Sequence, residues 1–432
     1  MSRGAVIVGA GQAGGRAAML LAERGYPGPV MLIGAEPLPP YERPPLSKDM
    51  LADPAAAPAF LAAADEYERL GVRMMLGRRV VSIDRAARRV VLDDGTTVPY
   101  RQLVLATGGR PRHLPFQLQR LQTLRTVDDV HAIAAQAAGA RSVLVIGGGV
   151  IGLEVAATLR IKGLAVTVVE IGSRLLGRNF PHPVAALIAE RHRARGVDIR
   201  TGLRVRTMWE DAAGVHATLS NDETITADFA VAGIGIVPDT GLAQDAGLIV
   251  DDGVVVDEAM RSSDPAIFAI GDMAAQAGAD GRFARYETWQ NANVTAERAA
   301  AAILGEALPP RDAPWFWTDQ FDLNVQLAGR TGPEVEGARI VEQGSTVAGG
   351  RVFLLIEGRR LAGVAAVNAG RDMSVCRRLV AAEVELPDGF VAAEVFDARA
   401  ARALLGSSRV GGSRVSGPQA NASQASAHPV DA

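Results

Sequence analysis

The stretch AVIVGAGQAGGRAAMLLAERG, residues 5–25, decides the fold. Its first four residues are an apolar, largely β-branched run that predicts a buried strand, and its second half has the composition of a helix. Between the two, Gly9, Gly11 and Gly14 form a G-x-G-x-x-G motif. We expect Gly9 to permit the turn, Gly11 to admit a pyrophosphate, and Gly14 to let the helix pack closely on the strand. Together with a strand expected at residues 30–33, this predicts a β-α-β dinucleotide-binding unit.

The same order of elements recurs in the second quarter of the chain. A strand at residues 142–146 leads into Gly147-Gly148-Gly149-Val150-Ile151-Gly152, a helix, and a strand that ends at Glu170. Two such units predict two doubly wound α/β domains with parallel sheets.

Each unit is followed by a hairpin and then by an apolar strand that ends in glycines, so the architecture is duplicated. The hairpin strands and the strand after them are expected at residues 88–92, 97–100 and 103–106 in the first half, and at 215–219, 224–226 and 230–236 in the second. After Pro309 the pattern becomes α+β, with strands near residues 324–328, 345–348 and 352–356 and a helix at 373–383.

A carboxylate follows the second strand of each unit. Glu36 and Glu170 occupy positions at which a carboxylate accepts hydrogen bonds from ribose hydroxyls. A carboxylate at position 170 also repels the 2′-phosphate of NADP, so the sequence favours NAD. Arg174 and Arg178 are close enough in sequence to reverse that preference.

Two dinucleotide sites in one chain indicate that one holds a bound FAD and the other a nicotinamide cofactor that exchanges. Residues 266–272 form a strand that ends in Gly-Asp, and Asp272 is placed to bond a ribityl hydroxyl of a flavin; the alternative is a helix N-cap. Residues 103–109 form a second strand that ends in glycines, which lets the backbone close over a cofactor.

Composition excludes several classes of protein. The 432 residues contain one cysteine, Cys376, so the chain has no internal disulfide, no thiolate zinc site, no iron–sulfur cluster of its own and no redox-active dithiol. This cysteine usage favours the cytoplasm. A net charge of −3 argues against nucleic acid as the main partner. The longest uncharged apolar stretches, such as residues 142–153, are too short to span a membrane, which needs about 20 residues.

At this point several motifs together resemble one family. They are Arg43-Pro44-Pro45-Leu46-Ser47-Lys48, Leu105-Ala106-Thr107-Gly108-Gly109-Arg110-Pro111-Arg112, residues 232–238, residues 269–272 and Pro314-Trp315-Phe316-Trp317-Thr318-Asp319-Gln320, besides the two glycine motifs. Over residues 4–405 the chain is similar to the FAD-containing, NADH-dependent ferredoxin reductases of bacterial oxygenase systems. The segments at 43–48 and 315–320 are the specific ones, because glycine motifs occur in many flavoproteins.

The resemblance implies an α/β, glutathione-reductase-like flavoprotein with two dinucleotide-binding domains and an α+β C-terminal domain. The implied divisions are an FAD-binding domain at residues 1–111 and 238–309, an NADH-binding domain at 112–237 and the C-terminal domain at 310–405. Residues 406–432 are rich in Ser, Gly and Ala and have no apolar period, which predicts a disordered tail. The implied reaction passes a hydride from NADH to FAD and then single electrons to a [2Fe-2S] ferredoxin. That ferredoxin serves a cytochrome P450 or a Rieske-type oxygenase.

The resemblance also assigns roles to residues. Lys48 lies beside the flavin, and Glu154 helps to orient the nicotinamide, so these two are the expected catalytic residues. The remaining positions expected to contact FAD are Gly9, Gly11, Ala13, Gly14, Glu36, Arg43, Val80, Ala106, Thr107, Gly108, Arg125, Asp272, Thr288 and Trp289. Those expected to contact NADH, besides Glu154, are Gly147, Gly149, Val150, Ile151, Gly152, Glu170 and Gly235.

The sequence departs from the family pattern at Ala35, where an acid is sometimes found, so the ribose contact depends on Glu36 alone. An NADH oxidase without a protein partner and an NADH-binding signalling flavoprotein remain as alternatives. Cys376 is interpreted as a small packing residue. We expect a monomer or weak homodimer.

A docking surface for an acidic ferredoxin is the remaining expectation. It would combine the three tryptophans Trp289, Trp315 and Trp317 with nearby arginines; domain packing is the alternative for the latter two tryptophans. The candidate arginines are Arg311, Arg371, Arg377 and Arg378.

Overall fold

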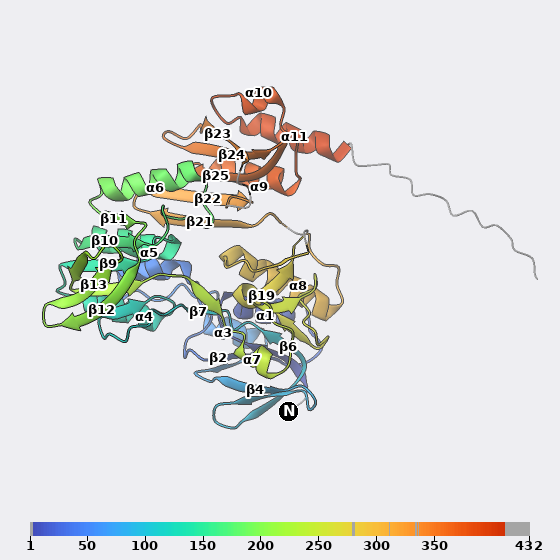
Figure 1. Ribbon diagram of the computed structural model, residues 1–432. Helices are drawn as coiled ribbons and strands as arrows, with labels where there is room; N and C mark the ends of the chain where they lie inside the picture. Colours follow the sequence, from blue (N-terminus) through green and yellow to red (C-terminus); the bar gives the residue numbers. More distant parts are fainter. Residues whose placement is uncertain (1–2, 279–280, 311, 333–334, 336, 411–432) are drawn as a thin grey trace, which may run out of the picture.

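The computed structural model describes residues 3–278, 281–310, 312–332, 335 and 337–410. Its elements form three groups (Figure 1): a lower group that contains β2 and α1, a group at the left that contains β9 and α5, and the C-terminal elements above both. Among the described residues, no helix is both long enough and apolar enough to cross a bilayer.

The first group is built on a sheet of order β3-β2-β1-β6-β5-β4, with β18 paired to β6. Its strands are β1 (Gly4–Val8), β2 (Val30–Gly34), β3 (Val72–Leu76), β4 (Val80–Asp84), β5 (Arg89–Leu92), β6 (Thr97–Leu105) and β18 (Ile267–Ala269). The predicted parallel unit and the predicted hairpin both occur here, because β1 is parallel to β2 and to β6, while β5 is antiparallel to β6. Helices α1 (Gln12–Glu23) and α8 (Trp289–Leu304) pack against each other on this sheet, so distant parts of the chain share one core.

Smaller elements complete the first group. They are η1 (Pro44–Ser47), α2 (Asp49–Ala52), α3 (Ala64–Arg69), α7 (Gly241–Asp245), β17 (Val254–Val256), η2 (Gly271–Met273), β19 (Ala274–Ala277) and β20 (Phe283–Ala284).

The second group has a parallel sheet of order β11-β10-β9-β15-β8. Its strands and helices are β8 (Leu121–Thr123), α4 (Val127–Ala137), β9 (Ser142–Ile146), α5 (Val150–Ile161), β10 (Ala165–Glu170), α6 (His182–Ala194), β11 (Asp198–Thr201) and β15 (Phe229–Ala232). An antiparallel sheet of β12 (Val205–Asp211), β13 (Gly214–Leu219) and β14 (Thr224–Ala227) contains the second predicted hairpin.

The chain passes between these two groups through a pair of short strands. β7 (Gly109–Pro111) leads out of the first group and β16 (Ile236–Pro238) leads back, and the two are antiparallel neighbours.

The C-terminal group is an antiparallel sheet of order β21-β22-β25-β24-β23 with three helices. Its elements are β21 (Trp315–Gln320), β22 (Leu323–Gly329), β23 (Arg339–Gly344), β24 (Arg351–Glu357), β25 (Arg360–Val367), α9 (Gly370–Ala381), α10 (Asp388–Val391) and α11 (Ala398–Val410). Cys376 on α9 is fully buried in this core, and burial raises the pKa of its thiol. The prediction that it is a small packing residue is confirmed.

Several predicted boundaries are wrong. Residues 97–100 and 103–105 belong to one continuous strand, β6, which ends one residue before the predicted boundary. Residues 230–236 are not one strand, because β15 ends at Ala232 and β16 begins only at Ile236. Residues 345–348 form no strand, since Ser345 Oγ accepts a hydrogen bond from Val347 N–H and so stabilises a turn. The tail predicted from residue 406 is wrong for its first residues, because α11 continues to Val410; residues 411–432 lie outside the described residues.

Helix α6 of the second group joins the C-terminal sheet at the turn between β21 and β22 (Figure 1). His192 on α6 is fully buried, with Nε2 2.8 Å from Gln320 Oε1 and its ring edge-on to Phe321 at 4.9 Å between centroids. Arg191 and Arg195 form ion pairs with Asp322 at the same turn, and Arg195 lies over the Phe321 ring. These residues form the α6 joint.

Replacing His192 by Gln should flatten the dependence of melting temperature on pH. Burial lowers the pKa of His192, and the hydrogen bond with Gln320 opposes part of that decrease. Over a range of acidic pH His192 is therefore protonated in the unfolded chain and neutral in the folded chain. Stability should therefore be complete above the ordinary histidine pKa and fall as pH drops below it, by at most about 1.4 kcal/mol per pH unit. Melting of both proteins between about pH 8 and pH 5 tests this. His113→Gln, at an exposed position, is the control and should leave the profile unchanged; equal profiles for His192→Gln and wild type would refute the assignment.

Candidate active site

A cavity of about 1490 Å³ runs between the first two groups and beneath the edge of the C-terminal sheet. Both glycine loops line it, and strand β21 contributes Phe316 and Trp317. Every residue that the sequence analysis assigned to a cofactor or to catalysis lines this cavity, except Gly14. The structure therefore brings together residues from position 9 to position 289.

The two glycine loops have the same geometry. A Cβ atom on Gly14 would lie 1.8 Å from the Gly9 carbonyl oxygen, and one on Gly152 would lie 2.1 Å from that of Gly147. In contrast, a Cβ on Gly11 would meet nothing closer than Arg43 at 3.9 Å. The last glycine of each motif is thus required by helix packing, whereas Gly11 leaves an open cradle that faces the cavity.

Beyond the first loop, polar side chains are held by one another. Glu36 accepts hydrogen bonds from the Tyr41 hydroxyl and from Arg43 Nη2, at 2.5 and 2.9 Å. Arg43 Nη1 also donates to the carbonyl of Arg125. Val80 lies buried at the same end. Tyr41 belongs to this group of polar side chains but was not predicted from the sequence. The only sequence feature that could have indicated it is its position two residues before the specific segment 43–48.

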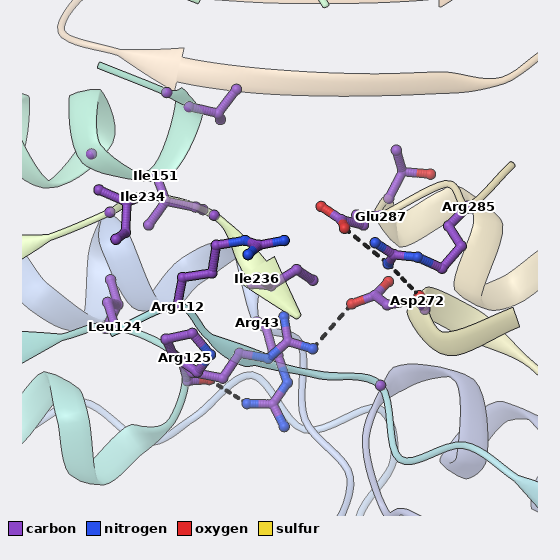
Figure 2. A pocket seen from close by; sticks show the side chains of 18 of the residues that line it. Arg43, Arg112, Leu124, Arg125, Ile151, Ile234, Ile236, Asp272, Arg285 and Glu287 are labelled. Carbon is purple, nitrogen blue, oxygen red and sulfur yellow. Dashed lines mark hydrogen bonds and ion pairs between the residues drawn. The ribbon is translucent and has the colours of Figure 1, made fainter. Parts of the chain in front are cut away.

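A second polar group closes the same site from the side of η2 (Figure 2). Arg125 Nη2 forms an ion pair with Asp272 Oδ2 at 3.0 Å. Arg285 donates to the Asp272 carbonyl and to Glu287, which fixes the backbone at that aspartate. Arg112 extends into the middle of the cavity between Ile234 and Ile236. Arg285, Glu287 and Arg112 were not assigned from sequence; only Arg112 belonged to a recognised motif.

Where the two halves of the cavity meet, the Glu154 carboxylate is the most buried charged group, with 2% of its surface exposed. Lys48 Nζ is 3.3 Å from its Oε1, Thr318 Oγ1 donates to Oε1 at 2.6 Å, and Ser47 Oγ donates to Oε2. Burial raises the pKa of Glu154, and the three donors oppose that rise because they stabilise the charged form. The sequence analysis named Lys48 and Glu154 but gave no role to Ser47 or Thr318.

In the second glycine loop, Glu170 is fixed by the backbone. Its Oε2 accepts from Gly148 N–H at 2.7 Å and its Oε1 from Gly172 N–H at 2.6 Å. Arg174 donates through Nη2 to the carbonyl of Phe180 at 3.1 Å. The carboxylate thus has a defined position at the end of β10, in the wall of the cavity.

Aromatic side chains cover the cavity where β21 meets α8. Trp317 is stacked on Trp315 at 5.1 Å and lies edge-on to Trp289 at 5.8 Å, measured between ring centroids. The Arg377 guanidinium lies over the Trp315 ring at 4.8 Å. Of the other arginines considered for docking, Arg371 and Arg378 are exposed, and Arg311 lies outside the described residues.

The residues present fit FAD and a nicotinamide dinucleotide. Buried Gln12 Oε1 and Trp289 Nε1 line the cavity and have no hydrogen-bond partner within the described part of the chain, so each offers an interaction to a bound group. The open cradle at Gly11 and the N-termini of α1 and α5 suit phosphates.

Comparisons with known proteins agree with this geometry. The family model for pyridine nucleotide-disulphide oxidoreductases matches residues 4–296, and the model for the reductase C-terminal domain matches residues 315–402. The chain is 43% identical over 390 residues to the ferredoxin–NAD(+) reductase component of the anthranilate 1,2-dioxygenase system of Burkholderia cepacia, covering 89% of this chain and 95% of that protein.

Two solved structures are also similar. The covalent putidaredoxin reductase–putidaredoxin complex contains a chain with a TM-score of 0.87 and 33% identity, covering 94% of this chain and 99% of that one. The ferredoxin reductase of the CYP199A2 system from Rhodopseudomonas palustris matches with a TM-score of 0.86 and 34% identity, covering 93% and 100%.

Replacing Gly14 by Ala should lower folding stability, whereas replacing Gly11 by Ala should lower the affinity for FAD. Gly14→Ala forces α1 away from the Gly9 carbonyl, so we expect a loss of about 3 kcal/mol in folding stability. Gly11→Ala should melt like the wild type before FAD is added but bind FAD several-fold more weakly, because its methyl group projects into the cradle. Calorimetry and fluorescence titration with FAD measure the two effects. A Gly14→Ala protein as stable as the wild type, or unchanged FAD affinity in Gly11→Ala, would contradict them.

Proposed function

The chain belongs to the pyridine nucleotide-disulphide oxidoreductases and, within them, to the ferredoxin–NAD(+) reductases, and from that premise we propose that it carries electrons from NADH through FAD to a [2Fe-2S] ferredoxin. The ferredoxin in turn serves a cytochrome P450 or a Rieske-type oxygenase. The observation that carries the proposal is one cavity joining two glycine loops, with Lys48 and Glu154 where its halves meet. Segment 44–50 contains no cysteine, so electrons have no dithiol to reach and leave for an outside acceptor.

Bound FAD supplies the redox chemistry, accepting a hydride from NADH and releasing its electrons singly. The protein's part is to bind and orient. The residues that we assign to FAD include the open glycine of the first loop and the polar side chains described above, which are Gly11, Glu36, Arg43, Arg125 and Asp272. The other residues assigned to FAD are Gly9, Ala13, Gly14, Lys48, Val80, Ala106, Thr107, Gly108, Thr288 and Trp289. We assign Gly147, Gly149, Val150, Ile151, Gly152, Glu154, Glu170 and Gly235 to NADH.

Lys48 and Glu154 have the central roles in this proposal. The Lys48 ammonium places positive charge where negative charge accumulates on reduction, and its contact with Glu154 keeps it there. Glu154 presents a carboxylate of fixed orientation to the nicotinamide, because Ser47 and Thr318 hold both of its oxygens. Neither residue transfers a proton in this scheme; the contribution is electrostatic and positional.

We further propose the domain divisions at 1–111 with 238–309, 112–237 and 310–405, a monomer or weak homodimer, and a cytoplasmic location. The buried, unpaired thiol of Cys376 supports a reducing compartment. Ferredoxin is proposed to dock over the tryptophan cluster, where Trp317 lines the cavity and Arg377 covers Trp315 with a positive charge.

The proposed function predicts a yellow protein that NADH bleaches under anaerobic conditions. NADH-driven reduction of cytochrome c should depend strongly on an added [2Fe-2S] ferredoxin, since ferredoxin is the proposed acceptor of the electrons that leave FAD. The experiment is a screen of candidate ferredoxins. Failure to take up FAD would overturn the proposal. Rapid oxygen consumption without ferredoxin dependence would indicate an oxidase instead, and slow NADH oxidation with every acceptor would indicate a signalling flavoprotein.

Glu170→Ala should weaken the preference for NADH over NADPH by about tenfold in kcat/KM. The reason is that the backbone N–H groups of Gly148 and Gly172 fix the carboxylate where the 2′-phosphate of NADPH would approach. Glu190→Ala, on the exposed face of α6, is the control and should keep wild-type discrimination. Unchanged discrimination in Glu170→Ala would remove the basis for assigning NADH from this residue.

A further inference from the structure

A line of buried hydrogen bonds leads from Glu154 away from the cavity and ends at the α6 joint. Thr318 Oγ1 is 2.6 Å from Glu154 Oε1, Gln320 Nε2 is 3.0 Å from Thr318 Oγ1, and His192 Nε2 is 2.8 Å from Gln320 Oε1. None of the four side chains is more than 2% exposed. We call His192, Gln320, Thr318 and Glu154 the Glu154 chain.

The alternation of strand β21 explains why this line exists. Successive strand residues point to opposite faces, so Thr318 and Gln320 share one face while Trp315 and Trp317 share the other. The aromatic face carries the tryptophan cluster beside α8, and the polar face is buried against α5 and α6. One strand therefore contacts the cavity on both of its sides.

The hydrogen bonds of the Glu154 chain have a direction. An ionised carboxylate only accepts, so Thr318 must give its hydroxyl proton to Glu154, and its oxygen is then free to accept from the Gln320 amide. That places the Gln320 carbonyl oxygen toward His192, which must donate through Nε2–H. The proton positions follow from this network and not from the positions of heavy atoms alone.

The opposite direction costs more free energy at both ends. It would need a proton on Glu154 within 3.3 Å of the Lys48 ammonium, a contact that stabilises the ionised carboxylate against the opposing effect of burial. It would also put a proton on His192 Nδ1, a buried atom that has no hydrogen-bond partner among the described residues. An unpaired buried donor carries the full cost of desolvation.

We propose that His192, Gln320 and Thr318 are positioning residues that act on Glu154 in sequence, so that the contact between α6 and the C-terminal sheet fixes the orientation of the carboxylate in the cavity. The inference rests on the proposed function only for its last step, the effect of Glu154 on NADH. Its earlier steps concern this chain's own side chains. Among the described residues Glu154 has three side-chain donors, of which only Thr318 comes from the C-terminal group.

A first experiment determines the direction of the hydrogen bonds in the Glu154 chain without an activity measurement. With only six histidines in the chain, ¹⁵N-histidine NMR of the FAD-loaded protein can assign His192 as the resonance missing from His192→Gln. The expected result is a neutral ring with the proton on Nε2. A proton on Nδ1, or a doubly protonated ring at neutral pH, would overturn the proposal whether or not the protein reduces a ferredoxin.

A second experiment tests the effect on Glu154 with matched pairs. Thr318→Val removes the hydroxyl and Thr318→Ser keeps it; His192→Phe removes the donor and His192→Gln keeps one. We expect the limiting rate of anaerobic reduction by NADH to fall about tenfold in the first member of each pair, and NAD⁺ affinity to weaken, with recovery to within about twofold in the second.

The same variants combined with Glu154→Gln separate positioning from general damage. If the three residues act through Glu154, their effects should largely disappear in the Glu154→Gln background. Equal effects in both backgrounds, or wild-type rates in His192→Phe and Thr318→Val, would overturn the proposal. If His192→Phe does not fold, the Thr318 pair decides. If the wild type itself is not reduced by NADH, the proposed function fails, while the NMR result still reports on the chain of hydrogen bonds.

Discussion

The buried charge on Glu154 is the constraint on which the arrangement of the three groups depends. A carboxylate removed from water is costly unless a cation and hydrogen-bond donors surround it. Here α5 supplies the carboxylate, the end of η1 supplies Ser47 and the residue after it, Lys48, and β21 supplies Thr318. Each group alone would carry an unsatisfied polar atom at this point. The requirement to satisfy it therefore favours the one arrangement in which all three meet.

The two glycine loops near Glu154 share one packing arrangement. In both glycine loops the last glycine is in contact with the carbonyl of the first, which brings a helix N-terminus against the end of a parallel strand. Both loops line the same cavity, which the ion pair of Lys48 and Glu154 lines as well. The duplication therefore gives one cavity two helix N-termini that suit phosphates.

Local features were predictable because they depend on near neighbours in sequence. The glycine loops, the hairpin of residues 88–100 and the strands β22 and β24 follow from periodicity and turn chemistry, and all occur in the structure. Predicted boundaries were wrong where a side-chain hydrogen bond stabilises a turn in place of a strand, as at Ser345. The roles of Thr318 and His192 could not be predicted for another reason. Thr318 contacts Glu154 across 164 positions of sequence, and no pattern near either residue indicates the contacts that it makes. The resemblance supplied Lys48 and Glu154 but not the residues that orient them.

The paired strands β7 and β16 have a consequence for motion. Because Pro111 lies opposite Ile236 and Gly109 opposite Pro238, both crossings between the first two groups lie side by side in one hydrogen-bonded ribbon. A ribbon of two strands twists and bends more easily than it stretches or shears. A rotation of the second group about this ribbon would strain the α6 joint, because His192 and the ion pairs of Asp322 attach the same group to the C-terminal sheet at a second place.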